Sequence, residues 1–495
     1  MATTRAQPDR ALATPARSLP VLAALATPAR ARPVLAALAL AVTVTGAVAP
    51  HLVREHALAL LLLGVVALVV HAVGPGRNTA PTVLTIGRER RLVAPTVEMA
   101  LHLSPVALLT LVFPLASARL DGVTVGGASL ITLLLASSLT MPWLAQAVCL
   151  PVYRAIGALV PAGDLSVITR RFCEVWPTSF VQSTPLLLLF VVPVELTLHW
   201  SPLAVATYLA LCLLHVGFAQ SLVMANVARD RVRWAAAWAA YAATLFALPE
   251  LWFLPPLAGL ATQLWWMRDE LRSVRRPVWL DHRDVALDLG RGLLLGSVLW
   301  ADKLFLFLVT DGVFAVDTVF LALLPAILAY NYYFVRLAPG FDRAVEEVRA
   351  AMEHQPQHRL ATESARLTGV VLTALARTGF VGATLGLLVT VVAAVRTPDA
   401  VGLVATVSLA SWLFVMTTVV CYKLDYIGER STAGLYSGVH LALCVVAFMV
   451  LPAGPVLYGW LAALETVLFV VALRSCITHW TTAEYALFWR HATSW

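Results

Sequence analysis

The sequence contains very little charge. Only 13% of its 495 residues are charged, against about a quarter in an ordinary soluble domain, and 60% are hydrophobic. Lysine is nearly absent, since Lys303 and Lys423 are the only two. A surface this apolar is incompatible with water over most of its area. The composition therefore excludes a soluble enzyme or binding module and predicts a membrane protein.

Motifs for cofactor, metal or nucleophilic chemistry are also missing. The six cysteines form no C-x-x-C pair and have no metal-ligand spacing to histidine. There is no G-x-x-x-x-G-K-[ST] loop and no catalytic-triad elbow. We therefore expect no catalytic residue, no metal and no cofactor. The net charge of +7 is spread over short loops and forms no basic stripe, so we expect no nucleic-acid partner.

Long apolar runs recur along almost the whole chain, and each is near the roughly 20 residues that a membrane-spanning helix needs. A basic arm, 1–32, precedes the first run, which is too long for a signal peptide and is expected to be retained. The sequence thus predicts an all-α membrane protein with about fourteen transmembrane helices. The predicted spans are 33–51, 57–74, 96–117, 124–152, 177–198, 202–226, 234–249, 251–267, 285–309, 317–337, 367–395, 400–422, 432–451 and 455–475.

The positions of the cations support this count. With the N-terminus inside, 29 of the 35 Lys and Arg residues fall on the inner side, and only Arg54, Arg119 and Arg396 lie in outer loops. Cytoplasmic loops carry such an excess of Lys and Arg. A missed span would reverse every later orientation and destroy the asymmetry. We therefore expect a multi-pass protein of the cell inner membrane with both termini in the cytoplasm.

The longest inner segment, 338–366, is expected to form an amphipathic helix. Phe341, Val345, Val348 and Met352 recur there at helical intervals among charged residues. Such a helix either lies at the membrane interface as a connector or docks a partner.

Ionisable residues inside spans are costly, so they are the candidate sites. Asp288 and Arg291 are three residues apart and are expected to pair on one helix face, or to contact substrate. Asp302 and Lys303 are neighbours that point about 100° apart, so they are expected not to share a partner direction. At least one of them should then face a polar lumen, unless Lys303 extends to the outer interface.

Two further charges lie deep in later spans. Glu465 and Arg377 have no opposite charge within one helical turn. Either they pair across helices, or Glu465 couples transport to a proton or cation. Tyr330 and Tyr333 lie in an aromatic run that either stacks on sugar rings or anchors the helix at the interface.

Four short patterns from residue 285 onward resemble the PelG-like exopolysaccharide transporters of the multidrug/oligosaccharidyl-lipid/polysaccharide exporter superfamily. They are W-A-D-K at 300–303, L-L-P-A-I-L-A-Y-N-Y-Y-F-V-R at 323–336 with Phe341, Y-K-L-D at 422–425, and Y-G at 458–459 with A-E-Y-A-L-F at 483–488. V-I-T-R-R-F at 167–172 also resembles the family. Ala338 stands where that family has an acidic residue, and the first two spans have no counterpart in it.

The resemblance implies two pseudo-symmetric six-helix lobes that rock to give alternating access. The expected domains are the arm 1–32, two extra helices in 33–75, an N-lobe in 76–267, a cytoplasmic linker in 268–283, a C-lobe in 284–475 and a tail in 476–495. The implied cargo is an exopolysaccharide or its precursor. The implied partners are membrane lipids, a cytoplasmic glycosyltransferase, and small membrane or regulatory subunits.

Several alternatives are compatible with the same residues. A lipid-linked oligosaccharide flippase or a cation or drug antiporter would belong to the same superfamily. An intramembrane glycosyl- or acyltransferase would have to place its chemistry within the bilayer, because the outer loops are short. A scaffold subunit without cargo would need the buried charges only for stability.

Overall fold

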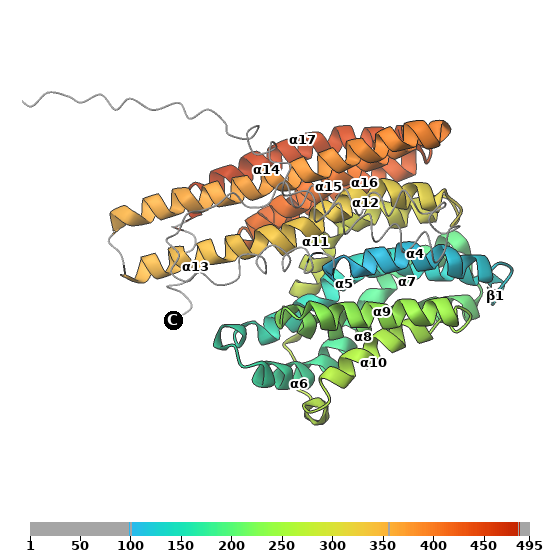
Figure 1. The fold of residues 1–495 in the computed structure, drawn as a ribbon, viewed down its shortest axis with the longest axis horizontal. Coiled ribbons are helices and arrows are strands. Elements are labelled where there is room, and N and C mark those ends of the chain that lie inside the picture. Colours follow the sequence, from blue (N-terminus) through green and yellow to red (C-terminus); the bar gives the residue numbers. More distant parts are fainter. Residues whose placement is uncertain (1–98, 100, 355–356, 484, 486–495) are drawn as a thin grey trace, which may run out of the picture.

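The computed structural model describes residues 99, 101–354, 357–483 and 485, and Figure 1 shows their fold. The predicted arm 1–32 and the two predicted spans in 33–75 lie outside these residues, as does most of the predicted tail. Each of the other twelve predicted spans contains a helix. The one sheet in the described part is a two-stranded hairpin. The chain is therefore an all-α membrane protein.

Of the twelve predicted spans within the described residues, the first six form the N-lobe, drawn in blue to green in Figure 1. A tight turn with Gly126 and Gly127 at positive φ closes the β1–β2 hairpin. The elements of this lobe are α4 (Ser104–Arg119), β1 (Thr124–Val125), β2 (Ala128–Ser129), α5 (Leu130–Gly157), η3 (Val160–Ala162), α6 (Leu165–Ser183), η4 (Thr184–Leu187), α7 (Leu188–Leu198), α8 (Pro202–Val227), α9 (Arg231–Ala247), α10 (Leu254–Trp266) and η5 (Leu271–Arg275).

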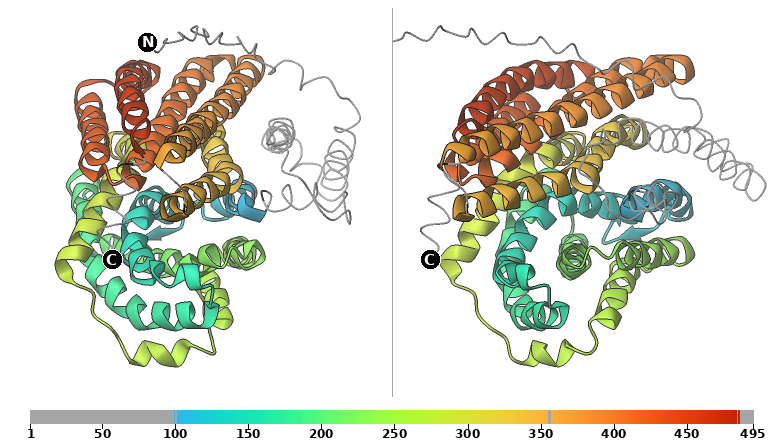
Figure 2. Two further views of the ribbon diagram at one scale, coloured as in Figure 1. Left: turned by 90° about the vertical axis from the view of Figure 1, so that its left-hand side faces the viewer. Right: turned by 60° about the vertical axis from the view of Figure 1, so that its left-hand side comes forward.

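The last six spans form the C-lobe, drawn in yellow to red. End-on views show the two lobes as separate helix groups packed side by side (Figure 2). The elements of this lobe are α11 (His282–Val309), α12 (Val316–Tyr332), the π-helix η6 (Tyr333–Leu337), α13 (Ala338–His354), α14 (Gln357–Arg396), η7 (Pro398–Ala400), α15 (Val401–Tyr426), α16 (Arg430–Val450) and α17 (Pro455–Trp480).

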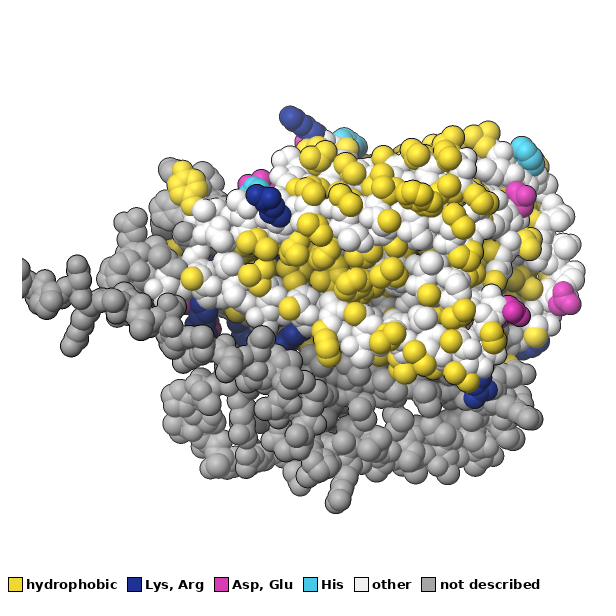
Figure 3. Space-filling model, turned by 90° about the horizontal axis from the view of Figure 1, so that it is seen from above, with side chains coloured by type: hydrophobic (Ala, Val, Ile, Leu, Met, Phe, Trp, Pro, Cys, Tyr) yellow, Lys and Arg dark blue, Asp and Glu magenta, His cyan; other side chains and the backbone are white. Residues whose placement is uncertain are grey.

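The surface and the helix lengths fit a bilayer. In the described ranges, nine helices are long and apolar enough to cross a membrane. The face shown in Figure 3 is apolar along its middle, with charged side chains near both ends. α9 and α10 form the expected hairpin, but the 13 residues of α10 extend only about 20 Å. This is shorter than the roughly 30 Å hydrocarbon core.

The amphipathic helix predicted in 338–366 is present as α13, over Ala338–His354. It continues α12 through the π-helix, and it packs along the first part of α14 instead of lying apart as a connector. Phe341, Val345 and Val348 are buried, at 3%, 1% and 1% exposure, in the core of the C-lobe. Their helical spacing therefore reflects packing within the protein. The pattern itself could not distinguish a helical partner from a membrane surface.

α5 and α11 meet closely at the boundary between the lobes. A Cβ atom added at Gly292 would lie 2.5 Å from Ala147 Cα and 2.7 Å from Gln146 O. One at Gly296 would lie 3.0 Å from the Trp143 ring. The Trp143 indole also donates a hydrogen bond to Leu293 O at 2.7 Å. We call this contact the α5–α11 seam.

We predict that Gly292→Ala lowers the thermal stability of the purified protein. The added methyl group meets the α5 backbone, which cannot move aside as a flexible side chain can, and overpacking of this kind costs about 1–3 kcal/mol. Gly290→Ala is the matched control, because a Cβ there has no atom within 4 Å. Its Tm, followed by tryptophan fluorescence, should be unchanged or higher, since alanine favours helix. Equal Tm values for the two variants would contradict the close contact.

Candidate functional site

A group of ionisable side chains lies in the core of the C-lobe. Asp302 and Lys303 come from α11, His440 from α16 and Glu465 from α17, and all four are at most 2% exposed. Each lies at least six residues, or about 9 Å, from either end of its helix. Charges at this depth are expensive in a membrane protein and are associated with function. We call these four residues the C-lobe charge cluster.

Asp302 and Lys303 contact each other, an ion pair that the sequence analysis did not consider. Lys303 Nζ lies 2.9 Å from Asp302 Oδ1, because its long stem bends back along α11. The ammonium group also donates to Ser411 Oγ at 3.1 Å and lies over the Phe414 ring, 5.2 Å from its centroid. Lys303 therefore does not extend toward the outer interface. It cross-links α11 to α15.

Glu465 pairs with His440 and not with Arg377. The His440 Nδ1–Glu465 Oε2 distance is 2.8 Å, and His440 Nε2 lies 3.3 Å from Cys444 Sγ. The His440 ring packs edge-on against Phe414, with centroids 4.8 Å apart. Phe414 thus lies beside both ion pairs. Arg377 is half-buried on α14 and lies within electrostatic range of Tyr332.

Several polar atoms of the cluster have no hydrogen-bond partner. Among the described residues, neither carboxylate oxygen of Asp302 has a partner with the geometry of a hydrogen bond, although Oδ1 lies 2.9 Å from Lys303 Nζ. Glu465 Oε1 has no hydrogen-bond partner among the described residues, and the Tyr458 hydroxyl lies within interaction distance of the Asp302 carboxylate. Buried acceptors of this kind favour a proton, a water or an ion. Within the described ranges, no three His, Cys, Asp or Glu side chains are arranged to hold a metal ion.

Asp288 and Arg291 do not pair with each other as the sequence suggested. Asp288 forms an ion pair with Arg154 of α5, with an Nε–Oδ2 distance of 2.9 Å, and Arg154 also contacts Asp284 at 3.0 Å. Arg291 forms an ion pair with Asp425 at the C-terminal end of α15. The two residues therefore act in different contacts. Arg154 ties the N-lobe to the C-lobe, whereas Arg291 ties α11 to its own lobe.

Tyr330 lies where the two lobes meet. Gln146 of α5 donates to its hydroxyl at 3.2 Å, and the Tyr422 hydroxyl donates to Gln146 Oε1 at 2.6 Å. The two tyrosine hydroxyls are 3.2 Å apart. Tyr333 is buried, at 4% exposure, and lies beneath the Lys423 ammonium group. The structure thus places Tyr330, but not Tyr333, in a polar contact between the lobes.

Sequence reasoning missed several members of these contacts. His440 drew no attention, because a neutral histidine in a span is far less costly than a carboxylate. Gln146 is uncharged and sits alone in an apolar run. The spacing of His440 and Cys444, four residues apart, was a usable signal for one polar helix face. Tyr422, Asp425 and Tyr458 lie within the patterns that carried the family resemblance, but those patterns assigned them no partner.

No protein-family model and no curated protein matches the sequence. Solved structures similar to the chain include a MATE in complex with Br-NRF, with a TM-score of 0.44 and 13% identity over 79% of this chain and 96% of that one. An outward-facing multidrug resistance MATE family transporter of the MOP superfamily gives 0.45 and 12% over 79% and 96%. A MATE in complex with MaL6 gives 0.45 and 13% over 79% and 97%. The likeness is remote, and none of the three is described as a polysaccharide transporter.

We predict that Asp302→Asn destabilises the protein and that adding Lys303→Met recovers most of the loss. The single change leaves a buried ammonium group without its carboxylate, which costs about 3–5 kcal/mol. The double change removes both charges and keeps a side chain of similar length. Tm values of the two variants in the same detergent provide the measurement. A double variant that is no more stable than Asp302→Asn would show that the two charges do not stabilise each other.

Proposed function

We propose that the chain is a transporter that moves an exopolysaccharide or its precursor across the inner membrane by rocking of the two lobes. The C-lobe charge cluster is the observation that carries this proposal. A scaffold has no need of four ionisable side chains with unsatisfied acceptors in the centre of a helix bundle. A transporter uses such groups to bind and release a proton or cation during its cycle.

The charges of the cluster cancel in two pairs, an arrangement that suits the coupling of transport to a proton. Asp302 with Lys303 is one formally neutral pair, and Glu465 with a protonated His440 is a second. Loss or gain of one proton leaves a net charge in a low-dielectric bundle, where it is costly unless the surroundings change. The pairs join α11 to α15 and α16 to α17. A change of protonation therefore alters the packing of most of the lobe.

The contacts between the lobes support a rocking motion. On the inner side these contacts are polar and can separate. Arg154 pairs with Asp284 and Asp288. Gln146 forms hydrogen bonds with Tyr330 and Tyr422. Groups of this kind can exchange partners for water when a cytoplasmic opening forms. The glycine-lined part of the α5–α11 seam is tightly packed, and the two lobes could rotate about it as an axis. Parallel six-helix repeats with a path between them are a common transporter design.

The proposed cargo is inferred from the sequence resemblance and from the aromatic side chains at the polar contact between the lobes. Tyr330, Tyr422 and Phe334 pack around one another, with Tyr330–Phe334 and Phe334–Tyr422 centroids 4.8 and 5.9 Å apart. Aromatic faces beside hydroxyl and amide groups suit sugar rings. A cytoplasmic glycosyltransferase would then supply the chain, with small membrane or regulatory subunits as further partners. No contact among the described residues favours a lipid-linked oligosaccharide or a small drug instead.

We predict that Glu465→Gln abolishes polysaccharide export while leaving the protein folded. The amide keeps the shape of the side chain and can still bond to His440, but it cannot take up or lose a proton in the working pH range. Export would be scored as extracellular polysaccharide in the source cells after replacement of their own copy, at matched protein levels. The loss should exceed about ten-fold, as expected for removal of a coupling group.

Asp317→Asn is the matched control, because Asp317 is an exposed carboxylate in the first turn of α12. It should export normally. Full export by Glu465→Gln and by the Asp302→Asn/Lys303→Met double variant would leave the cluster with a structural role only. If these variants lost proton-driven substrate uptake in proteoliposomes but exported polysaccharide normally, the result would point to a different cargo.

A further inference from the structure

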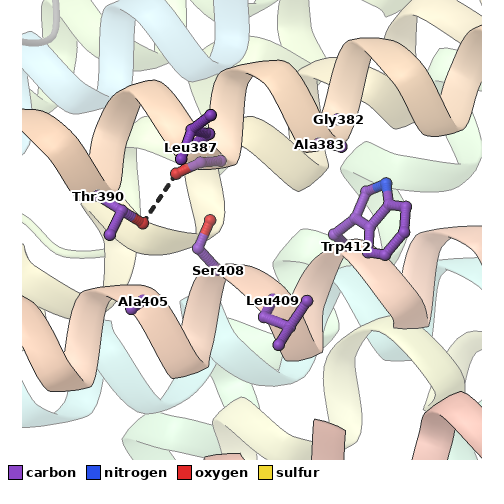
Figure 4. A pocket seen from close by; sticks show the side chains of 9 residues that line it. Gly382, Ala383, Leu387, Thr390, Ala405, Ser408, Leu409 and Trp412 are labelled. Carbon is purple, nitrogen blue, oxygen red and sulfur yellow. Dashed lines mark hydrogen bonds between the residues drawn. The ribbon is translucent and has the colours of Figure 1, made fainter.

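A narrow groove lies between α14 and α15, outside the charge cluster and the α5–α11 seam. Its volume is about 230 Å³, and its lining includes Gly382, Ala383 and Gly386 of α14 and Ser408 and Trp412 of α15 (Figure 4). From Gly382 to Thr390 it follows α14 for about 12 Å. Leu387 and Leu409 stand at its rim and are 68% and 50% exposed. The groove therefore opens on the apolar outer surface of the bundle.

Two glycines bring the helices close enough to form the floor of the groove. A Cβ at Gly382 would lie 2.6 Å from Trp412 Cδ1, and one at Gly386 would lie 2.9 Å from Ser408 Oγ. The Trp412 indole N–H is already donated to Gly379 O, at 2.9 Å. The Thr390 hydroxyl is donated to Gly386 O, as Figure 4 shows. Both of these polar groups are satisfied within the protein.

Ser408 is different, because its hydroxyl has no hydrogen-bond partner within the described part of the chain, although the residue is only 3% exposed. Neighbouring hydroxyls on α15 donate to the carbonyl four residues earlier, as Thr406 and Thr418 do. Ser408 makes no such bond, and its Oγ points into the space between the two helices (Figure 4). An unused buried donor in an otherwise apolar groove calls for an acceptor from outside.

The depth and size of the groove restrict what can occupy it. Ser408 is seven residues from the start of α15 at Val401, about 10 Å below the helix end that the cation distribution places outside. The headgroup zone is about 5–7 Å thick on each side, so Ser408 lies just within the hydrocarbon. A cavity of about 150 Å³ holds a benzene ring, whereas a helix is about 10–12 Å wide. The groove thus fits a hydrocarbon chain and is too narrow for a helix.

We propose that this groove binds the acyl chain of an outer-leaflet phospholipid, and that Ser408 donates a hydrogen bond to the ester carbonyl at the head of that chain. The apolar rim and the two glycines admit the tail, and the ester supplies the missing acceptor. A leucine or valine from a second copy of the protein could enter the groove but would leave Ser408 unsatisfied. The site does not depend on the transported cargo.

The test is photolabelling of the purified full-length protein in liposomes with phosphatidylethanolamine that carries a diazirine in its acyl chain. Peptide mapping should place the adducts mainly on 382–390 and 405–412. Ala383→Leu fills the groove, because leucine occupies volume that the acyl chain would take. It should reduce labelling there by about five-fold or more, on the order of the change expected when a well-packed contact is lost. Ala394→Leu, at an exposed α14 position outside the groove lining, is the matched control and should label normally.

A second comparison tests the hydrogen bond without changing the shape of the groove. Ser408→Ala should reduce labelling by the ester-linked lipid about five-fold, the usual worth of one neutral hydrogen bond. It should hardly affect an ether-linked analogue, which lacks the carbonyl. Adducts spread evenly over the apolar surface, or unaffected by Ala383→Leu, would overturn the proposal. Cross-linking of these segments to a second copy would overturn it in favour of a protein partner.

Discussion

The close approach of α5 and α11 is the contact on which the rest of the structure depends. It exists because Gly292 and Gly296 have no side chain where the α5 backbone and Trp143 pass. In a bilayer, helices gain little from burying apolar surface against one another, so tight packing over small residues becomes a main source of affinity. This contact fixes Gln146 and Arg154 against the C-lobe, and it sets the rotation of α11 about its axis.

The rotation of α11 matters because this helix serves both lobes. Val285, Leu289 and Phe307 belong to the apolar core of the N-lobe, whereas Leu295, Val298 and Leu299 belong to that of the C-lobe. The same helix carries Asp288, which faces Arg154, and Lys303, which faces α15. A shift of α11 at the boundary therefore reaches the charge cluster directly, without a chain of intermediate residues. In the transport cycle proposed above, α11 is the physical route between protonation in the C-lobe and opening between the lobes.

The sequence was sufficient for the helices but not for their polar partners. Hydropathy predicted twelve spans in the described part, and each contains a helix, although only nine helices there are long and apolar enough to cross a membrane. The candidate charges Asp302, Lys303 and Glu465 were also found, since their cost makes them conspicuous. The pairing of Asp288 with Arg291 was wrong, because spacing along one helix cannot reveal a nearer partner on another helix. The pairing of Glu465 with Arg377 was wrong for a related reason. The partner of Glu465 is His440, and a histidine does not stand out in a sequence as a charged residue does.

The unbroken run of α12 into α13 has a mechanical consequence. The 17 residues of α13 extend about 25 Å past the π-helix, and Figure 1 shows α13 and α14 projecting beyond the other helices at that end. α13 and α14 form a packed pair rooted in the C-lobe, so in the rocking motion proposed above a tilt of a few degrees would move the far end of this pair through a larger arc than the helices in the bilayer. A soluble protein that grips this end would sense which way the membrane domain is tilted.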